Sequence, residues 1–384
     1  MKIFHQVEEY RKPMEIISGM GGDAILRGTE MLESELGFLC GLIKRYRPKK
    51  MVEVGVAAGG TSAVILACLD QLELCTEFFS VDLAEIHFRE KDKPTGYLID
   101  ELKRYGVDTS HHCLLLGKTI AARLEQIGDG IDFLILDTAH SLPGELLDFL
   151  VAFPYLDENA VVVVHDVALQ FTKVERFDVA TSVLFHSVTA DKFLNNIAYY
   201  PNIAAFQLNQ DTENYMMDVC AGLLMPWAYM PAEKDLADYE AVLSKHYPPG
   251  FLKLYAQARD GMREKVLPFV KKTPCVDIKD IHFNINLRIL IYGTKKLGRK
   301  CLSYLREQGM CADGFVVSDG RKKEDSIDGV PVFELSQIRN SEDVLIILAN
   351  AHEETENNLR RYGYHWIKVE YRFIKDFGDC LALQ

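Results

Sequence analysis

Five apolar runs, each followed by a segment with helical spacing, constrain the fold of this chain more than any other feature. We expect these runs to be strands, at 51–54, 78–82, 112–116, 131–137 and 160–166. Near-continuous runs of Val, Ile, Leu and Phe are typical of parallel strands covered by helices on both faces. The sequence therefore predicts an α/β fold with a doubly wound, mostly parallel sheet.

The ends of these strands carry residue types that ligand sites use. A glycine or an aspartate stands at or just beyond each predicted end: Gly55, Asp82, Gly117, Asp137 and Asp166. Ligands of open α/β sheets bind beyond the carboxyl ends of the strands. We therefore expect one ligand site along this edge of the sheet.

A second α/β pattern begins near residue 285. It consists of a strand, a glycine turn, a helix and another strand, at 287–292, 293–298, 299–308 and 315–319.

Between the two α/β patterns, we expect strands that finish the first sheet and then a segment with prolines and aromatic residues. We expect aromatic residues such as those at Pro226–Trp227 to pack in the protein or, alternatively, to line an acceptor pocket. The predicted parts are a first domain with N-terminal helices at 1–200, a helical and aromatic linker or lid at 201–284, and a second, smaller Rossmann-like domain at 285–384.

The amino-acid composition limits which binding partners and which cellular compartment we expect. Lys and Arg number 43 against 56 Asp and Glu, a formal net charge of −13. A chain this acidic has no general attraction for nucleic acid or anionic lipid, so we expect neither nucleic-acid nor membrane partners. The nine cysteines are an odd number, are scattered and form no C-x-x-C pair. This usage is typical of reduced thiols, so we expect a cytoplasmic protein.

The turn after the first strand is the most informative motif. Glycine at Gly55 permits a tight turn, and Gly59 and Gly60 would let a ligand approach the backbone. Asp82, at the end of the next strand, has the position of an acid that accepts hydrogen bonds from ribose hydroxyls. The turn is not a dinucleotide fingerprint, because Ala57 stands where that fingerprint has glycine. The alternative is a glycine-rich turn with a strand-capping aspartate.

The segment 53–62 resembles the first motif of class I S-adenosylmethionine-dependent methyltransferases. The segments 131–148 and 161–167 resemble the branch of that family with a D-x-x-H … H-D signature, which includes sugar and antibiotic O-methyltransferases and cephalosporin-hydroxylase-like proteins. The resemblance spans about 32–169. The chain departs from the family at Thr138 and at Glu158–Asn159, where glycines are common. These positions belong to turns, so the departures weaken the substrate assignment more than the fold.

This resemblance implies S-adenosylmethionine as cofactor and methylation of a hydroxyl on a small-molecule acceptor, such as a sugar or nucleotide sugar. It implies that residues of the first domain contact five parts of this cofactor: the methionine end, its ammonium group, the ribose, the adenine and the sulfonium. The residues implied to bind the cofactor are Glu53, Gly55, Gly59, Gly60, Thr61, Asp82, Gly117, Lys118 and Asp137.

Two histidines lie near the ends of the fourth and fifth strands and are the candidate catalytic bases, His140 and His165. An imidazole with an ordinary pKa near 6.5 is suited to take a hydroxyl proton near neutral pH. The alternative is a structural histidine bonded to Asp137 or Asp166. These two acids end adjacent strands, so their carboxylates are also a candidate Mg²⁺ site. Alternatively, they serve the cofactor and a loop.

The C-terminal turn is a degenerate dinucleotide motif followed by Asp319. Lys295 stands where the middle glycine would let the backbone approach a pyrophosphate. The region resembles the N-terminal domain of sugar acetyltransferases and related nucleotide-sugar modules, and a docking domain without a ligand is the alternative.

For the whole chain, two further functions stay open: a nucleotide- or nucleotide-sugar-binding scaffold, and an NAD-dependent sugar-modifying enzyme. Homo-oligomerisation also stays open.

Overall fold

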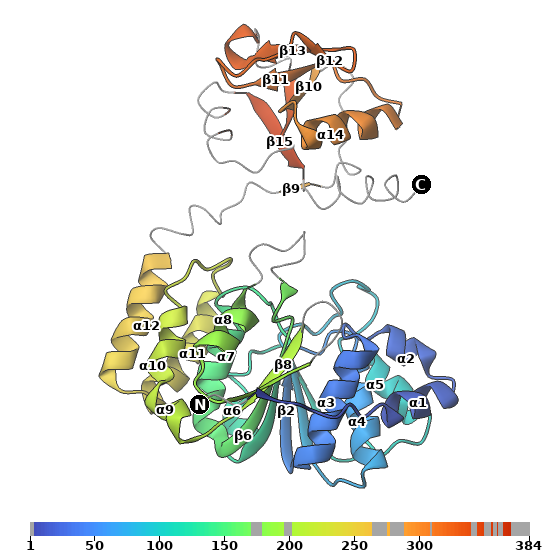
Figure 1. Ribbon diagram of the computed structural model, residues 1–384, viewed down its shortest axis with the longest axis vertical. Coiled ribbons are helices and arrows are strands. Elements are labelled where there is room, and N and C mark those ends of the chain that lie inside the picture. The colour runs from blue at the N-terminus through green and yellow to red at the C-terminus, as the bar shows by residue number, and fades with distance from the viewer. Residues whose placement is uncertain are drawn as a thin grey trace. The chain divides into compact units, whose positions relative to one another are not determined.

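The computed structural model describes two compact units, Met1–Val270 and Lys271–Gln384 (Figure 1). The described residues are 4–169, 179–195, 202–262, 275–276, 288–307, 309–338, 344–348, 355, 359 and 364–369. Each unit has its own sheet. Within the described residues, every helix is too short or too polar to cross a membrane.

The first unit is built on an eight-stranded sheet with the order β1-β7-β8-β6-β5-β2-β3-β4. Its strands are β1 (Phe4–His5), β2 (Lys50–Val54), β3 (Glu77–Asp82), β4 (His112–Leu116), β5 (Ile131–Leu136), β6 (Leu156–His165), β7 (Asp191–Leu194) and β8 (Ile203–Gln207). All neighbouring pairs are parallel except those that β8 makes with β6 and β7. The prediction of a mostly parallel α/β sheet is confirmed.

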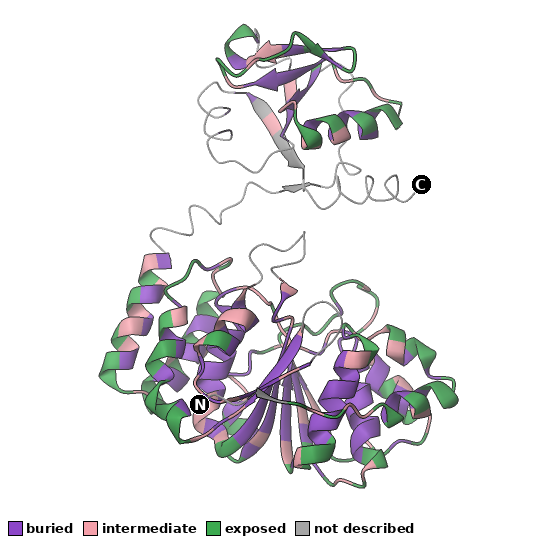
Figure 2. Cartoon of the chain, in the orientation of Figure 1, coloured by how far each residue is buried: buried purple, intermediate pink, exposed green. Residues whose placement is uncertain are grey.

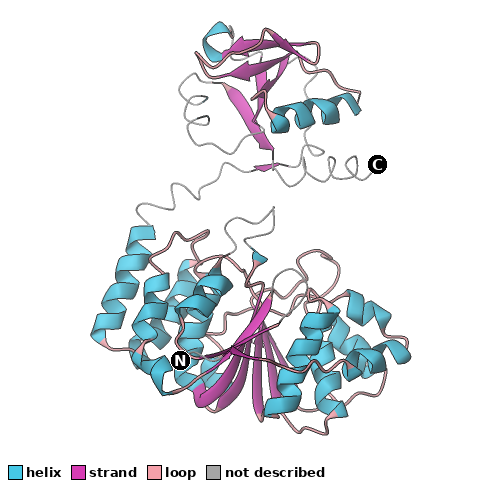
Figure 3. Cartoon of the chain, in the orientation of Figure 1, coloured by secondary structure: helices cyan, strands magenta, loops and turns pink. Residues whose placement is uncertain are grey.

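Helices cover both faces of this sheet, and the strands between them are buried (Figures 2 and 3). One face carries α1 (Lys12–Gly19), α2 (Asp23–Arg27), α3 (Glu33–Tyr46), α4 (Gly60–Gln71) and α5 (Tyr97–Lys103). The other face carries α6 (Leu124–Ile127), α7 (Gly144–Ala152), α8 (Ala180–Ser187), α10 (Met216–Gly222), α11 (Glu233–His246) and α12 (Pro249–Gly261). Successive strand residues alternate between the two cores, as Phe133 and Leu134 do. Alternation with apolar residues on both sides explains the continuous apolar runs.

Residues 202–262 lie within the first unit, whereas the sequence predicts a separate linker or lid at 201–284. Strand β8 pairs with β6 inside the sheet. The helices that follow, α9 (Gln210–Asn214) to α12, add Leu223, Trp227 and Phe251 to the buried core. The indole of Trp227 donates a hydrogen bond to the carbonyl of Leu223 at 2.8 Å, so this residue packs, as expected.

The second unit is a smaller α/β domain with the strand order β12-β13-β11-β10-β14-β15-β9. Its elements are β9 (Cys275–Val276), β10 (Arg288–Tyr292), α14 (Lys296–Glu307), β11 (Gly314–Val317), β12 (Ser326–Ile327), β13 (Val330–Glu334), η5 (Leu335–Gln337), β14 (Val344–Leu348) and β15 (His365–Val369). At Gly298 a Cβ atom would lie 1.8 Å from the carbonyl oxygen of Gly293, so close helix packing requires this glycine. The similarity of this unit to nucleotide-sugar modules stays a prediction.

Candidate functional site

The glycine turn joins β2 to α4 and is closed by backbone from elsewhere in the chain. At Gly55, with φ +95°, a Cβ atom would lie 1.8 Å from the carbonyl oxygen of Asp137. At Gly59 it would lie 2.9 Å from the Cα of Gly96, and at Gly60 it would lie 2.6 Å from backbone of Gly28. The chain's own packing therefore explains these glycines, whereas the sequence alone suggested that Gly59 and Gly60 make room for a ligand. Their contact with a cofactor stays a prediction.

Asp82 ties the glycine turn to the end of β3. Its Oδ2 accepts hydrogen bonds from the backbone N–H groups of Val56 at 2.9 Å and Ala57 at 3.2 Å. Its Oδ1 accepts one from Ala84 at 2.8 Å. This is the capping role that the sequence left open as an alternative. An ionised carboxylate has about four acceptor positions, so three bonds leave room for a ligand hydroxyl.

Glu53 lies beneath the turn and is 1% exposed. Its Oε2 accepts hydrogen bonds from the hydroxyls of Ser62 and Ser80. Burial raises the pKa of Glu53 to about 8, against the lowering effect of the two serines. In this structure Glu53 therefore supports the turn from inside.

The remaining predicted cofactor residues surround the same strand ends. Thr61 is buried in the first turn of α4, and Lys118 is exposed after β4. The backbone N–H of Gly117 donates to the carbonyl of Asp82 at 2.9 Å. A Cβ atom at Gly117, where φ is +79°, would lie 2.7 Å from Oε1 of Glu85. The ends of β3 and β4 are thus joined directly, beside the glycine turn.

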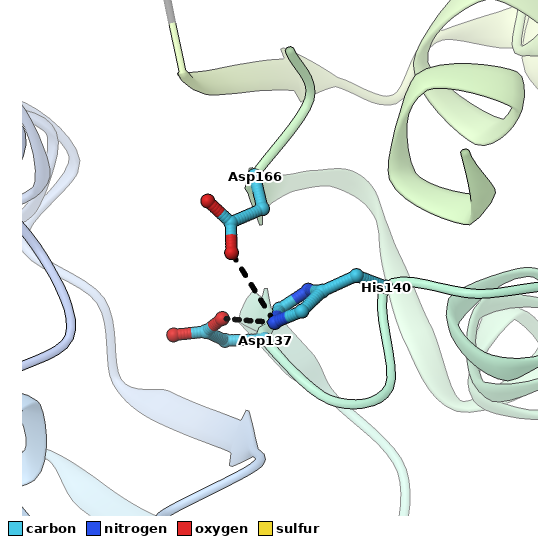
Figure 4. Close-up of side chains that lie close together, drawn as sticks. All are labelled: Asp137, His140 and Asp166. Atoms are coloured by element: carbon cyan, nitrogen blue, oxygen red, sulfur yellow. Dashed lines mark ion pairs between the residues drawn. The ribbon is translucent and has the colours of Figure 1, made fainter. Parts of the chain in front are cut away.

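Asp137, His140 and Asp166 converge where β5 and β6 end (Figure 4). The Nε2 atom of His140 lies 3.2 Å from Oδ2 of Asp166 and 3.8 Å from Oδ1 of Asp137. One donor atom from each residue lies within 4.8 Å of the other two. His140 and Asp166 have φ values of 56° and 58°, a left-handed conformation that non-glycine residues seldom adopt. Strain of this kind often accompanies functional sites.

His165 lies behind this cluster, 2% exposed. Its Nδ1 is 3.0 Å from Oδ1 of Asp137, and its Nε2 is 3.4 Å from Oε2 of Glu35 on α3. Burial lowers the pKa of His165, but Asp137 and Glu35 outweigh it and hold that pKa well above its usual value. Both ring nitrogens face carboxylates of the protein. This geometry matches the alternative of a structural histidine, and a catalytic role of His165 stays a prediction.

His140 is more accessible, with its side chain 23% exposed. Burial lowers its pKa, but Glu145, Asp137 and Asp166 outweigh burial and raise the pKa of His140 to about 9. The ring is therefore an imidazolium at neutral pH in this structure. Asn202 completes the cluster, because its Nδ2 donates to Oδ1 of Asp166 at 2.6 Å.

Three residues of the site carry no sequence signal that would have identified them: Glu35, Glu145 and Asn202. Glu35 and Glu145 are acidic residues in the first turns of their helices, where acids are common because they favour the helix N-terminus. Their only unusual property is burial, which a single sequence does not reveal.

Residues 52–167 match the family model described as a methyltransferase domain. The match contains the glycine turn and the cluster at β5 and β6, and it covers less than half of the chain. No curated protein matches this chain.

Several solved structures are similar to about half of the chain. The SAH-bound methyltransferase of Podospora anserina is 13% identical, with 52% of this chain and 88% of that chain covered and a TM-score of 0.37. The O-methyltransferase of tomaymycin synthesis from Streptomyces achromogenes, in complex with SAM, is 16% identical. The match covers 53% of this chain and 92% of that chain, with a TM-score of 0.36. The TDP-rhamnose 3'-O-methyltransferase of calicheamicin biosynthesis is 16% identical, with 52% of this chain and 81% of that chain covered and a TM-score of 0.33. At these identities and TM-scores the likeness carries no functional conclusion.

Proposed function

We propose that the first unit is an S-adenosylmethionine-dependent methyltransferase that methylates a hydroxyl of a small molecule. The observation that carries this proposal is the position of two groups inside one methyltransferase-domain match. The glycine turn with Asp82 and the cluster of Asp137, His140 and Asp166 stand along the same edge of the sheet, and Gly55 packs against Asp137. One group is suited to hold a nucleoside, and the other is suited to handle a proton beside it.

We assign the roles of the chain's own residues from the family resemblance together with this arrangement. The free acceptor position of Asp82 is directed to the ribose hydroxyls, and Gly117 and Lys118 flank the adenine. Bound S-adenosylmethionine supplies a methyl group on a sulfonium, which is already a good leaving group. The protein therefore has two tasks, to align the acceptor oxygen with the methyl carbon and to take the proton that this oxygen loses. His140 is placed for the second task, because its Nε2 faces the cluster.

We also propose a divalent cation at Asp137 and Asp166. The donor set fits a cation, since the two carboxylates converge and each has a second partner that orients it. When bound, the cation would offset the charge of the two acids and lower the pKa of an acceptor hydroxyl. Oxygen donors suit Mg²⁺ and Mn²⁺. With the acids neutralised, the pKa of His140 would fall toward its ordinary value, where the ring is able to accept a proton.

The acceptor class rests on the family resemblance alone. We propose a sugar or a related hydroxyl-bearing metabolite, with the second unit as a candidate for holding a nucleotide-sugar carrier.

Calorimetric titration of the full chain with S-adenosylmethionine, NAD and UDP-glucose tests the proposed function. We expect binding of S-adenosylmethionine and of its product S-adenosylhomocysteine in the micromolar range. Binding of NAD with no binding of S-adenosylmethionine would instead support a nicotinamide-dependent enzyme. Binding of the nucleotide sugar alone would support a scaffold.

A further inference from the structure

We propose that Glu145 is the positioning residue of His140. Its carboxylate holds the Nδ1 side of the imidazole ring and leaves Nε2 facing Asp137 and Asp166. The inference rests on the proposed function only in giving His140 a chemical role, since the contacts themselves are independent of any ligand.

The carboxylate of Glu145 holds the loop that carries His140. Glu145 lies in the first turn of α7 and is fully buried. Its Oε1 accepts hydrogen bonds from the backbone N–H groups of His140 at 2.7 Å and Thr138 at 3.1 Å. The two bonds fix the chain between β5 and α7 in the bend that gives His140 its left-handed φ.

The same carboxylate also meets the ring of His140. Oε1 of Glu145 lies 3.4 Å from Nδ1 of His140. Two buried atoms of this pair, Nδ1 of His140 and Oε2 of Glu145, have no hydrogen-bond partner among the residues described. Buried polar groups are normally paired, and an Nδ1–H directed at this carboxylate gives Nδ1 of His140 its partner.

The consequence concerns the other ring nitrogen. When an imidazolium ring loses one proton, the hydrogen bonds of its two nitrogens decide which nitrogen keeps its proton. With Nδ1–H given to Glu145, the proton that leaves is the one on Nε2, the atom that faces Asp166 and Asp137. Nε2 is then the atom that gives up and accepts a proton at the site. Among the residues that the structure describes, Glu145 is the charged group that meets the ring on its Nδ1 side.

The test is the NMR signal of the His140 ring in the full chain, labelled with ¹⁵N-histidine and assigned with His140→Gln. We expect wild-type protein to show an Nδ1–H proton far downfield that exchanges slowly with water. Glu145→Gln keeps a carbonyl oxygen for the two backbone N–H groups but removes the charge, so that signal should be lost or move strongly upfield. Asp148→Asn is the matched control. Asp148 is a buried carboxylate on the same helix that accepts hydrogen bonds from Thr138 and Tyr239, so its loss should leave the His140 signal in place.

An unchanged His140 signal in folded Glu145→Gln would overturn the proposal. If that variant does not fold, the wild-type spectrum decides. A protonated, slowly exchanging Nδ1 supports the proposal, and a ring protonated only at Nε2 rejects it. Calorimetry with S-adenosylhomocysteine on the same samples separates this result from the proposed function. Absence of binding by wild-type protein would reject the methyltransferase proposal and leave the ring signal to judge Glu145.

Discussion

The acidic side chains at the sheet edge are each held by a second group that comes from another part of the chain. Asp137 is held by His165, Asp166 by Asn202, and Asp82 by backbone N–H groups of the glycine turn. A carboxylate that is already oriented loses little entropy when a ligand binds to it. These residues are therefore the ones whose replacement should change binding most.

Asp82→Ala should weaken the binding of S-adenosylhomocysteine at least tenfold. A hydrogen bond to a charged group contributes about 1.5–3 kcal/mol, and about 1.4 kcal/mol corresponds to a factor of ten. Isothermal titration calorimetry measures the effect. The structure adds that Asp82 also supports the turn, so Asp82→Asn, which keeps one oxygen acceptor, should lose less. Asp100→Ala on α5, a change at an exposed acid, is the control and should bind normally. A folded Asp82→Ala protein with wild-type affinity would refute the ribose role.

Wild-type protein should bind Mn²⁺ in the absence of any cofactor, and Asp166→Asn should weaken that binding at least tenfold. The physical reason is that the variant removes one of two negative charges that face the same point. The free Mn²⁺ signal in electron paramagnetic resonance gives the bound fraction. Asp157→Asn, an exposed acid near the start of β6, should behave as wild type. Equal binding by all three proteins would place any cation elsewhere.

At the level of strands and helices, the sheet could be predicted because its strands are buried on both faces. Their apolar runs are uninterrupted, and the acid or glycine after each run marks where the strand ends. Helix starts were less predictable. Helix α4 begins at Gly60, a glycine that the sequence placed in the turn, because the turn leads straight into the helix. The positions of Glu35 and His165, 130 residues apart, depend on how α3 lies on the sheet, which no local pattern contains.

A buried polar network joins three strands and one helix beneath the glycine turn. Nε2 of His112 on β4 lies 3.0 Å from the hydroxyl of Ser80 on β3, which donates to Glu53 on β2, as does Ser62 on α4. Burial, with Lys103, lowers the pKa of His112 to about 4. Burial raises that of Glu53 to about 8. The network is thus uncharged at neutral pH, which suits its position inside the sheet.

This network predicts a stability that falls as pH rises. The pKa of Glu53 is about 8 in the folded chain and about 4.5 when unfolded, so the folded state binds the extra proton between these values. The stabilisation from Glu53 is complete below pH 4.5 and is lost as pH rises through 8. Glu53→Gln has no proton to lose, so its stability relative to wild type should increase from pH 6 to pH 8. Urea unfolding at the two pH values measures this difference, and Glu77→Gln, an exposed change on β3, should show none. A pH-independent difference for Glu53→Gln would mean that Glu53 is ionised in the folded chain.

For the whole molecule, the existence of two α/β units followed from the sequence, but the division between them did not. The predicted division fell after residue 284, where a fresh strand and glycine turn begin. The structure instead divides the chain after Val270. The reason is β9, a two-residue strand at Cys275–Val276 that pairs with β15 near the other end of the chain. A strand this short, far in sequence from its partner, has no local signal.

The position of this division can be tested by comparing two fragments of the chain. A fragment of residues 1–270 should fold and bind S-adenosylhomocysteine with the affinity of the full chain, because it retains the eight-stranded sheet and both of its cores. A fragment of residues 1–284 adds β9 without its partner strand, which leaves unpaired backbone groups at the end of the chain. We therefore expect it to be no more stable than 1–270 and more prone to aggregate. Thermal unfolding, calorimetry and light scattering on the two fragments give the three comparisons. If 1–270 is unfolded while 1–284 is folded and binds the ligand, residues 271–284 belong to the first unit and the division lies where the sequence suggested.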